Sequence, residues 1–337
     1  MQTADFDYEL PPELIAQSPA HPRDASRLLV YAEGKVSHHT FHELPDLLQP
    51  TDVLVINETK VIPARLQTLE CKEVFLSRKA AQQDGEGEIW ECLVRGGKFF
   101  QPGMQFEIGE DLRGEVLEIL PSGERLIRFH SADFHSALDK YGFTPLPPYI
   151  HQTAQKIPEY QTVYAKKEGS VAAPTAGLHF TPEIFGKLAE KGIAVEKITL
   201  HVGVGTFALV KAEEVEKHEM HSEVFELPAE VASRLNQYKK AGRRIIAVGS
   251  TSCRVLESCA NESGELIPRS SETDIFIYPG YRFRFIDAML TNFHLPKSTL
   301  IMLVAAKIGR EKILELYEIA KREKYRFYSF GDAMLLL

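Results

Sequence analysis

Two histidines, His179 and His201, are the first candidates for chemistry because each adjoins a run of glycine and threonine. His179 lies in "PTAGLHFT" and His201 in "ITLHVGVGTF". An imidazole exchanges protons near neutral pH, so it suits general acid–base catalysis. A single histidine is more often structural, but two that flank one helix–strand unit favour a shared site. We therefore predict acid–base roles for both, and cofactor contacts for the neighbouring Thr175 and Gly177.

The glycines after His201 indicate a sharp turn or a close approach of the backbone to another group. The stretch "GVGTFA" has the spacing G-x-G-x-x-A of a dinucleotide-binding loop. Such a loop needs a helix that begins at once and an acidic residue about 20 positions later. Residues 207–210 are too apolar and β-branched to begin a helix. The pattern does not predict a dinucleotide fold, but Gly203, Gly205 and Thr206 remain predicted cofactor contacts.

A third loop, "VGSTS", follows the apolar run "RRIIAV" and precedes a helical pattern. The free N–H groups and the positive dipole end at such a helix start suit a carboxylate or a phosphate. Capping of the helix by serine or threonine is the more common role of these residue types. The predicted anion-binding residues are Gly249, Ser250, Thr251 and Ser252.

Aromatic and basic residues alternate in the stretch "YRFRF". If it is extended, its aromatic rings share one side and its arginines the other. Rings that stack on bases and arginines that pair with phosphates are typical of RNA-binding surfaces. A half-buried strand, apolar inside and charged outside, gives the same pattern. The predicted nucleic-acid and substrate contacts here and just downstream are Tyr281, Arg282, Arg284, Asn292 and His294.

Metal binding and passage through a membrane are not expected. The stretches "HHTFH" and "HEMH" are rich in histidine, but the second is not H-E-x-x-H. The four cysteines show no C-x-x-C spacing, which fits a reducing compartment. The longest apolar run, "LIMLVAA", is far shorter than the ~20 residues of a membrane span, and the acidic start "MQTADFDYEL" is unlike a signal peptide. We expect a cytoplasmic protein.

The composition limits the class of protein further. The chain has 337 residues, of which 44% are hydrophobic and 26% are charged, as in ordinary soluble globular proteins. Its net charge of −8 argues against nonspecific binding of polyanions but permits one local basic face. No repeat of about 20–50 residues is visible, so a solenoid is not predicted.

The elements that must carry these loops alternate between strand and helix. Strands are predicted at "RLLVY", "DVLVIN", "AVEKITLHV", "RRIIAVG" and "TDIFIY". Helices are predicted from Pro182 and at "AEVASRLNQYKKAG", "TSCRVLESCA", "STLIMLVAAKIG" and "REKILELYEIAKRE". This alternation favours a mostly parallel sheet with binding loops at the carboxyl ends of its strands.

The pattern changes between residues 66 and 143. Short alternating runs such as "IWECLVR", "QFEIG", "GEVLEIL" and "RLIRFH" are separated by glycine-rich turns. Regularly spaced short strands are typical of a small antiparallel barrel or sandwich. We predict an α/β catalytic domain formed by residues 1–65 and 144–337, and an inserted all-β barrel-like domain of residues 66–143.

Several stretches together resemble a known family. They are "FDYELPPELIAQSPAHPRDASRLL", "DVLVINETKVIPARL", "PLPPYI", "YQTVYA", "GSVAAPTAGLHFT", "ITLHVGVGTF", "AVGSTSCRVLES", "TDIFIYPGYRFRFIDAMLTNFHLPKSTLIMLVAA" and "YRFYSFGDAMLL". The chain is similar here to the S-adenosylmethionine:tRNA ribosyltransferase-isomerases, the epoxyqueuosine-forming enzymes of queuosine biosynthesis. The resemblance extends from about residue 5 to residue 335 and is least evident in residues 66–143.

The resemblance implies a fold and an activity. The implied fold is an α/β domain with an inserted β-barrel-like domain. The implied reaction transfers the ribosyl unit of S-adenosylmethionine, a co-substrate, to 7-aminomethyl-7-deazaguanine at the wobble position of a tRNA. The unit is isomerised to an epoxy-cyclopentane, and adenine and methionine are released. The implied partner is therefore this tRNA, and a monomer is sufficient.

The resemblance also suggests roles for residues. The implied mechanism begins when a base removes a proton from the carbon beside the sulfonium, a step that we assign to His179 or His201. The "GSTS" loop would hold the methionine carboxylate. Asn57, Lys60 and Arg65 lie in another shared motif and are predicted phosphate or substrate contacts, with a structural ion pair as the alternative for the two basic residues.

Two other classes of protein remain open from the residues alone. "GVGTFA" suggests a nucleotide-dependent methyltransferase or dehydrogenase, although a helix start and an acidic partner are missing. The alternation in "YRFRF" would also suit a non-catalytic RNA-binding protein. The number of polar loops after predicted strands exceeds what binding alone requires, which favours the enzyme.

Overall fold

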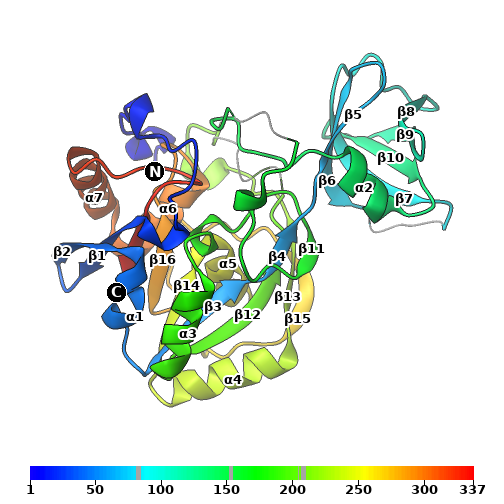
Figure 1. The fold of residues 1–337 in the computed structure, drawn as a ribbon. Helices are drawn as coiled ribbons and strands as arrows, with labels where there is room; N and C mark the ends of the chain where they lie inside the picture. Colours follow the sequence, from blue (N-terminus) through cyan, green and yellow to red (C-terminus); the bar gives the residue numbers. More distant parts are fainter. Residues whose placement is uncertain (81–84, 152–154, 204, 206–209) are drawn as a thin grey trace.

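The computed structural model describes residues 1–80, 85–151, 155–203, 205 and 210–337. Within these ranges the chain forms sheets of nine, six and two strands. Figure 1 shows the nine-stranded sheet with its helices as one body and the six-stranded sheet to the right of it. The glycine- and threonine-rich loops around His179, His201 and Gly249 belong to the larger body.

The large sheet is mixed rather than mostly parallel. Its strand order is β15 (Arg269–Thr273), β13 (Glu223–Leu227), β12 (Ala194–Leu200), β3 (Asp52–Asn57), β14 (Arg244–Val248), β16 (Ala288–Asn292), β17 (Ala333–Leu336), β1 (Arg27–Ala32) and β2 (Lys35–Thr40). The four central strands, β12, β3, β14 and β16, are parallel, and so is the β17–β1 pair. The remaining neighbours are antiparallel.

The correction to the predicted sheet has a physical reason at β17. Two helices, α6 (Thr299–Ile308) and α7 (Arg310–Arg322), separate β16 from β17, and they pack against each other. Gly309 joins them at φ 91°, a conformation that glycine adopts without steric cost. A hairpin of two helices returns the chain to the end of the sheet from which it left, so β17 runs against β16.

Helices cover both faces of the large sheet because its central strands are apolar on both sides. In β3, Leu54 and Ile56 pack on the face covered by α1 (Leu44–Leu47) and α3 (Pro182–Glu190). Val53 and Val55 face the opposite side, where the covering helices are α4 (Ala229–Lys240), α5 (Gly249–Cys259), α6 and α7. Each fully buried aliphatic side chain of this kind contributes roughly 1.5–3 kcal/mol.

The six-stranded sheet is antiparallel throughout and nearly closed. Its order is β5 (Arg65–Gln67), β6 (Glu73–Lys79), β7 (Glu88–Arg95), β10 (Arg125–His130), β9 (Leu112–Ile119) and β8 (Gln105–Gly109). The Leu69 N–H donates to the Glu107 carbonyl at 2.9 Å, which links the end of the first strand to the last. The predicted barrel-like architecture is thereby confirmed, with α2 (Phe134–Tyr141) packed beside it.

The barrel and the large sheet are connected through β4 (Thr59–Val61) and β11 (Lys167–Ser170), which form the parallel two-stranded sheet. Ile62, Ala64 and Val171 pack into the barrel's core from outside residues 66–143. The residues at which one domain ends and the other begins therefore stay a prediction.

Local predictions were correct for most elements and wrong for one strand. Helix α3 begins at Pro182 as predicted, and the Thr181 hydroxyl caps it by accepting from the Ile184 N–H at 3.4 Å. Gly242 follows α4 at φ 72°, as a residue after a helix end often does. The stretch "TDIFIY", predicted as a strand, is not one, because β15 ends at Thr273 and residues 274–278 have no regular structure.

Candidate functional site

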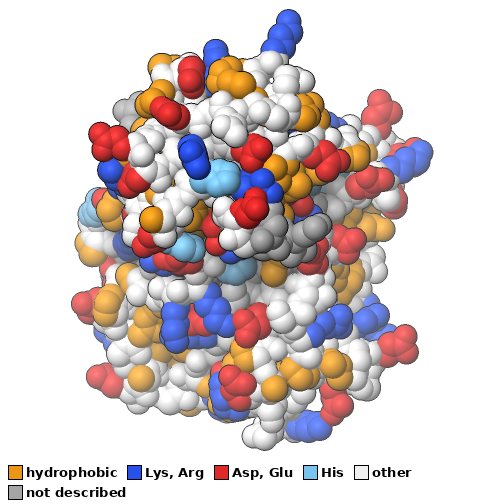
Figure 2. All heavy atoms as spheres, turned by 90° about the vertical axis from the view of Figure 1, so that its right-hand side faces the viewer, with side chains coloured by type: hydrophobic (Ala, Val, Ile, Leu, Met, Phe, Trp, Pro, Cys, Tyr) orange, Lys and Arg blue, Asp and Glu red, His pale blue; other side chains and the backbone are white. Residues whose placement is uncertain are grey.

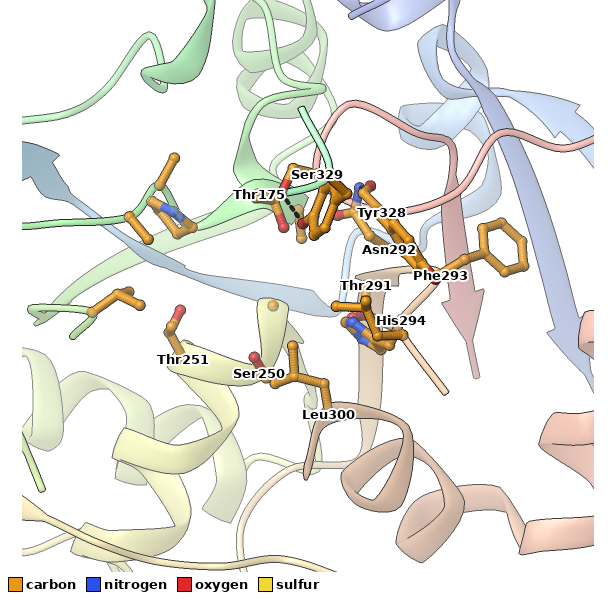
Figure 3. A pocket seen from close by; sticks show the side chains of 18 residues that line it. Thr175, Ser250, Thr251, Thr291, Asn292, Phe293, His294, Leu300, Tyr328 and Ser329 are labelled. Carbon is orange, nitrogen blue, oxygen red and sulfur yellow. Dashed lines mark hydrogen bonds between the residues drawn. The ribbon is translucent and has the colours of Figure 1, made fainter. Parts of the chain in front are cut away.

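A pocket lies where the carboxyl ends of β14 and β16 meet, the usual place for ligands in open α/β sheets. Figure 3 shows labelled side chains from the start of α5, from the end of β16 and the loop after it, and from the segment before β17. It also labels Thr175, from the segment before α3, and Leu300, from α6. The polar lining residues are Tyr149, Thr175, Ser250, Thr251, Thr291, Asn292, His294, Tyr328 and Ser329.

The start of α5 forms one wall of this pocket and has no side-chain cap in the described chain. The first N–H groups of a helix have no partner within it, and the helix dipole adds a positive potential there. Thr251 Oγ1 and Ser252 Oγ are buried and have no hydrogen-bond partner among the described residues. This wall can therefore hold a carboxylate or phosphate. Of the four residues predicted to bind an anion, Gly249, Ser250 and Thr251 line the pocket and Ser252 does not.

Asn292, at the end of β16, is buried and lines the same pocket. Its Nδ2 donates to the Tyr328 carbonyl at 3.1 Å and lies 3.3 Å from His179 Nε2. Its Oδ1 has no partner in the part of the chain that the structure describes. Tyr328 has φ 71°, which is unusual for a bulky residue and is the kind of strained backbone that gathers at functional sites.

His179 lies behind this pocket rather than in its lining. Its ring stacks on Phe41 with centroids 4.9 Å apart, and its Nδ1 lies 2.8 Å from Ser26 Oγ. Burial, followed by the charges of Arg326 and Arg23, lowers the pKa of His179 to about 3. With both ring nitrogens hydrogen-bonded inside the protein, His179 is placed to position its neighbours, and its role as proton acceptor stays a prediction.

His201 lies apart from His179, which corrects the prediction of one site shared by the two histidines. His201 Nδ1 is 2.8 Å from Thr59 Oγ1, and its ring lies against the backbone of Gly169 on β11. Burial and the charge of Lys167 lower the pKa of His201. The next residue, Val202, lines the pocket, and successive side chains of an extended chain point to opposite sides.

His294 lines the pocket, and among the described lining residues it is the one histidine. Its Nε2 lies 2.8 Å from Thr291 Oγ1, and its backbone N–H donates to the Tyr317 hydroxyl at 2.7 Å. Tyr8 donates to its carbonyl, so both sides of its backbone are fixed. Burial lowers the pKa of His294 to about 3, which keeps the imidazole neutral near pH 7.

The predicted glycine contacts have packing explanations. A Cβ on Gly177 would lie 1.9 Å from the Tyr164 hydroxyl, and one on Gly205 would lie 2.2 Å from the His221 ring. Gly203 donates its N–H to Glu223 Oε1 at 2.9 Å. The groups that lie close to these glycines are therefore side chains of the protein, where the sequence suggested a cofactor. Thr206, the remaining prediction in this loop, lies outside the described residues.

A second pocket adjoins the first and shares Ser250, Thr251 and Leu300 with it. Its apolar walls include the stretch that was predicted as a strand, which explains why those apolar residues are not in the sheet. The buried ion pair between Arg254 and Glu223 lies in its lining. Burial and the charge of His221 lower the pKa of His218 in the same wall. The start of α5 thus faces two connected cavities.

The residues of the "NETKVIPAR" motif have protein partners. Asn57 is buried, and its side chain bonds the backbone of Leu200 in both directions, with Nδ2 to O at 2.9 Å and N to Oδ1 at 3.0 Å. Lys60 pairs with Glu168 at 2.7 Å, and Arg65 pairs with Glu73. These contacts favour the structural alternative over a phosphate site.

Charges alternate on the face that carries the barrel. Figure 2 shows Lys and Arg side chains there interspersed with Asp and Glu side chains. Arg78 exemplifies this pairing, because it contacts both Glu91 and Glu272. The part of this face that the structure describes therefore shows no continuous basic patch.

Tyr281, Arg282 and Arg284 lie away from the pocket, before the amino end of β16. The segment is not a strand and bends at residues 284–285, but it exposes both arginines while its aromatic residues are partly or fully buried. Tyr281 donates to Glu257 Oε2 at 3.1 Å, near the end of α5 opposite to the pocket. A role in tRNA binding stays a prediction, and it would involve a surface distant from the pocket.

Sequence reasoning missed the aromatic and hydroxyl groups that close the pocket. Tyr149 and Ser329 share a hydrogen bond of 2.7 Å, and Tyr149 packs on Tyr328 with ring centroids 4.7 Å apart. Burial raises the pKa of Tyr149 to about 12, so its hydroxyl stays protonated. The motifs "PLPPYI" and "YRFYSFGDAMLL" contain these residues, but nothing in their spacing places them beside "GSTS".

Neither a metal site nor a membrane-spanning helix is present among the described residues. No group of three or more His, Cys, Asp or Glu residues is arranged to hold a metal ion there. No helix in this part of the chain is long and apolar enough to cross a membrane.

The fold and the pocket define an α/β protein with an inserted barrel and an uncapped helix start that lines a pocket at the carboxyl edge of its sheet. A family model described as "Queuosine biosynthesis protein" matches residues 3–336. The chain therefore belongs to the queuosine biosynthesis protein family.

Similar proteins carry specific names. The S-adenosylmethionine:tRNA ribosyltransferase-isomerase of Desulfitobacterium hafniense is 51% identical over all of both chains, and that of Acetivibrio thermocellus is 49% identical over all of both. A crystal structure of S-adenosylmethionine tRNA ribosyltransferase from Thermotoga maritima has a TM-score of 0.55 and 38% identity, and the match covers 99% of this chain and 100% of that one.

Proposed function

We propose that this chain transfers the ribosyl group of S-adenosylmethionine to a tRNA and isomerises it, as the names of its relatives describe. The acceptor that we propose is 7-aminomethyl-7-deazaguanine at the wobble position, and the products are epoxyqueuosine in tRNA, adenine and methionine. The match to one enzyme family along the whole chain carries the proposal. The buried, unpaired hydroxyl groups at the start of α5 supply a place for the co-substrate.

The reaction needs groups of three kinds. A base removes the proton from the carbon beside the sulfonium, which gives an ylide, and adenine departs as the ribose opens. The amine of the tRNA base then adds, and closure of the epoxide expels methionine. The site must therefore offer a proton acceptor, a donor for the departing adenine, and a fixed hold on the methionine end so that the reacting carbon does not drift.

The open start of α5 suits the methionine carboxylate. N–H groups of the first helical turn and the hydroxyl of Thr251 can donate to its oxygens, and the dipole favours its charge. No other part of the described pocket lining carries a positive charge, since it contains no Lys or Arg. The helix start is therefore the place in this pocket where an anion is stabilised.

His294 is the acid–base group that we propose in place of His179. Its ring lines the pocket, where it can reach a bound ligand, whereas His179 lies behind the lining with both ring nitrogens bonded to protein groups. Replacing His294 by Gln should lower kcat for adenine release at least 100-fold, the usual range for general acid–base catalysis. His201→Gln, at a histidine outside the lining, should keep more than a tenth of the activity, and the reverse result would assign the step to His201.

The two competing classes receive less support. A methyltransferase or dehydrogenase would need a dinucleotide-type loop at "GVGTFA", and Gly203 and Gly205 have side-chain partners instead. A non-catalytic RNA-binding protein would not need a buried pocket with unpaired polar groups. We further propose that the enzyme acts as a monomer in the cytoplasm, where tRNA is modified.

The decisive experiment is release of adenine. The purified chain is incubated with S-adenosylmethionine and tRNA that carries 7-aminomethyl-7-deazaguanine, and free adenine and the modified nucleoside are measured by liquid chromatography and mass spectrometry. We expect equal amounts of adenine and epoxyqueuosine, and neither product with tRNA that carries guanine. Methylated tRNA without adenine would instead identify a methyltransferase.

A further inference from the structure

The amide of Asn292 can present only an acceptor to the pocket. One of its two N–H groups is directed to the Tyr328 carbonyl at 3.1 Å and the other to His179 Nε2 at 3.3 Å. A flipped amide would place oxygen against the Tyr328 carbonyl, two acceptors at hydrogen-bond distance. The orientation is therefore fixed, and Oδ1 is the free atom.

His179 is built to maintain this orientation. Its lowered pKa keeps the ring neutral, so Nε2 carries a lone pair for the Asn292 N–H, while Nδ1–H donates to Ser26 Oγ. Stacking on Phe41 prevents the ring from turning. Ser26 and Phe41 lie on segments far from Asn292 in the sequence, so three parts of the chain cooperate to hold one amide.

A buried acceptor without a partner is costly, on the order of 1–3 kcal/mol, unless a ligand satisfies it. Asn292 is 2% exposed, and its Oδ1 has no partner among residues 1–80, 85–151, 155–203, 205 and 210–337. The pocket's ligand should therefore bring an N–H or O–H donor to this atom.

The donor must be near the anion held by α5. Val248 and Leu290 are partners on the adjacent parallel strands β14 and β16, about 5 Å apart as neighbouring strands are. The helix start follows Val248 directly, and Asn292 lies two residues beyond Leu290. An α-amino acid carries an ammonium donor on the carbon next to its carboxylate, which matches this juxtaposition.

We propose that this pocket recognises the α-amino acid end of S-adenosylmethionine, with the carboxylate at the start of α5 and the ammonium donating to Asn292 Oδ1. His179 is the positioning residue for this contact. The assignment rests on the proposed function and names the part of the co-substrate that binds here. None of the described lining residues is Asp or Glu, so the ammonium is held by neutral acceptors and by its own carboxylate.

The test uses three ligands: S-adenosylmethionine, its deamino analogue with hydrogen in place of the amino group, and its decarboxy analogue. Dissociation constants are measured by calorimetry for the wild-type chain, Asn292→Ala and Thr251→Ala. We expect Asn292→Ala to bind S-adenosylmethionine and the decarboxy analogue about tenfold more weakly, and the deamino analogue as the wild type does. Thr251→Ala should show the crossed pattern, with a loss for the two ligands that keep the carboxylate.

The role of His179 is tested with the same ligands. His179→Gln offers an amide oxygen to the Asn292 N–H and should keep most of the preference for S-adenosylmethionine over the deamino analogue. His179→Leu offers no acceptor and should lose that preference about tenfold. A merely structural role would weaken all three ligands equally, so this ratio separates the two roles. If Asn292→Ala does not fold, the two variants His179→Gln and His179→Leu still test whether Asn292 Oδ1 binds the ammonium group.

An equal loss for all three ligands in Asn292→Ala, or an unchanged preference in His179→Leu, would overturn the proposal. Either result is distinct from failure of the proposed function, which is read from adenine release by the wild-type chain. An active wild type with the wrong ligand pattern would mean that the amino acid end binds elsewhere.

Discussion

The two ends of α5 differ in whether their buried polar groups have hydrogen-bond partners. At the first turn, Thr251 Oγ1 and Ser252 Oγ are buried without a partner among the described residues. Near the last turn, the Glu257 carboxylate accepts from the Tyr281 hydroxyl and from the backbone N–H groups of Arg284, Phe285 and Ile286, at 2.8–3.1 Å. One helix therefore has a start that is open to a ligand and an end that is closed by its own protein.

The difference shows which groups serve binding and which serve stability. Burying an unpaired hydroxyl costs free energy on folding, so such a group persists where a ligand completes it. A carboxylate with several backbone donors is already complete and fixes the segment that bonds to it. Substitutions at the start of α5 should thus change affinity, and substitutions near its end should change stability.

The largest effect is expected at Glu257. Glu257→Ala leaves buried N–H groups without an acceptor and should lower the free energy of unfolding by about 3 kcal/mol or more. Urea denaturation measures this loss, and the KM for S-adenosylmethionine of the folded fraction should change less than twofold. Glu257→Gln, which keeps one acceptor oxygen and the shape, should lose less. A loss below about 1 kcal/mol in Glu257→Ala would break the contrast.

Acid should destabilise the chain through its buried neutral histidines. The pKa values of His179 and His294 are about 3, below the ordinary 6.5 that they regain on unfolding, so the unfolded chain binds more protons as the pH falls. Stability is full above pH 6.5 and declines below it, by on the order of 2 kcal/mol per histidine between pH 7 and pH 5.

Denaturant titrations of the wild type, His179→Gln and the exposed-site control His42→Gln at both pH values test this expectation. His179→Gln should reduce the loss between pH 7 and pH 5 by on the order of 2 kcal/mol, and His42→Gln should not change it. An equal loss in all three proteins would show that His179 titrates normally in the folded chain.

A smaller effect is expected at Thr251. Thr251→Ala removes a hydroxyl that makes no protein hydrogen bond in the described chain, so stability should change by less than about 0.5 kcal/mol while S-adenosylmethionine binds about tenfold more weakly. Ser258 on the same helix is the matched control, because its hydroxyl lies 2.6 Å from Thr273 Oγ1. Ser258→Ala should lose about 1 kcal/mol of stability and no affinity, and the opposite pattern would contradict the comparison.

The smallest effect is expected on tRNA affinity, for substitutions near the last turn of α5. Arg282→Ala combined with Arg284→Ala should weaken tRNA binding and make it less dependent on salt, with the slope reduced by about one for each phosphate that is no longer neutralised. Arg113, exposed on barrel strand β9, serves as the control. An unchanged salt slope in the double variant would show that this surface does not bind tRNA.

Much of the fold follows from the sequence. Apolar runs such as "DVLVIN" and "RRIIAV" are central strands because both of their faces are covered, and the short alternating runs of the insertion form the barrel. The direction of β17 could not be predicted, because it depends on whether α6 and α7 form a hairpin. The strand predicted at "TDIFIY" failed because Ile275, Phe276 and Ile277 line a pocket, a setting that periodicity cannot distinguish from a sheet.

The candidate site was predicted in part. Gly249, Ser250 and Thr251 of "GSTS" line the pocket because a helix that directly follows a strand fixes its own geometry. His179 and His201 look alike in sequence, since each adjoins a glycine-rich loop, but only packing decides which way each ring points. The role of Asn292 depends on Tyr328 and His179, 36 and 113 residues away, and no local pattern contains such contacts.

The most direct test is a crystal structure of the chain with bound S-adenosylmethionine. The account predicts electron density for the methionine end in the pocket between β14 and β16. Its carboxylate should lie within hydrogen-bond distance of the first N–H groups of α5, and its ammonium within that distance of Asn292 Oδ1. Density for the adenine ring at the start of α5, or for the whole ligand outside this pocket, would contradict the account.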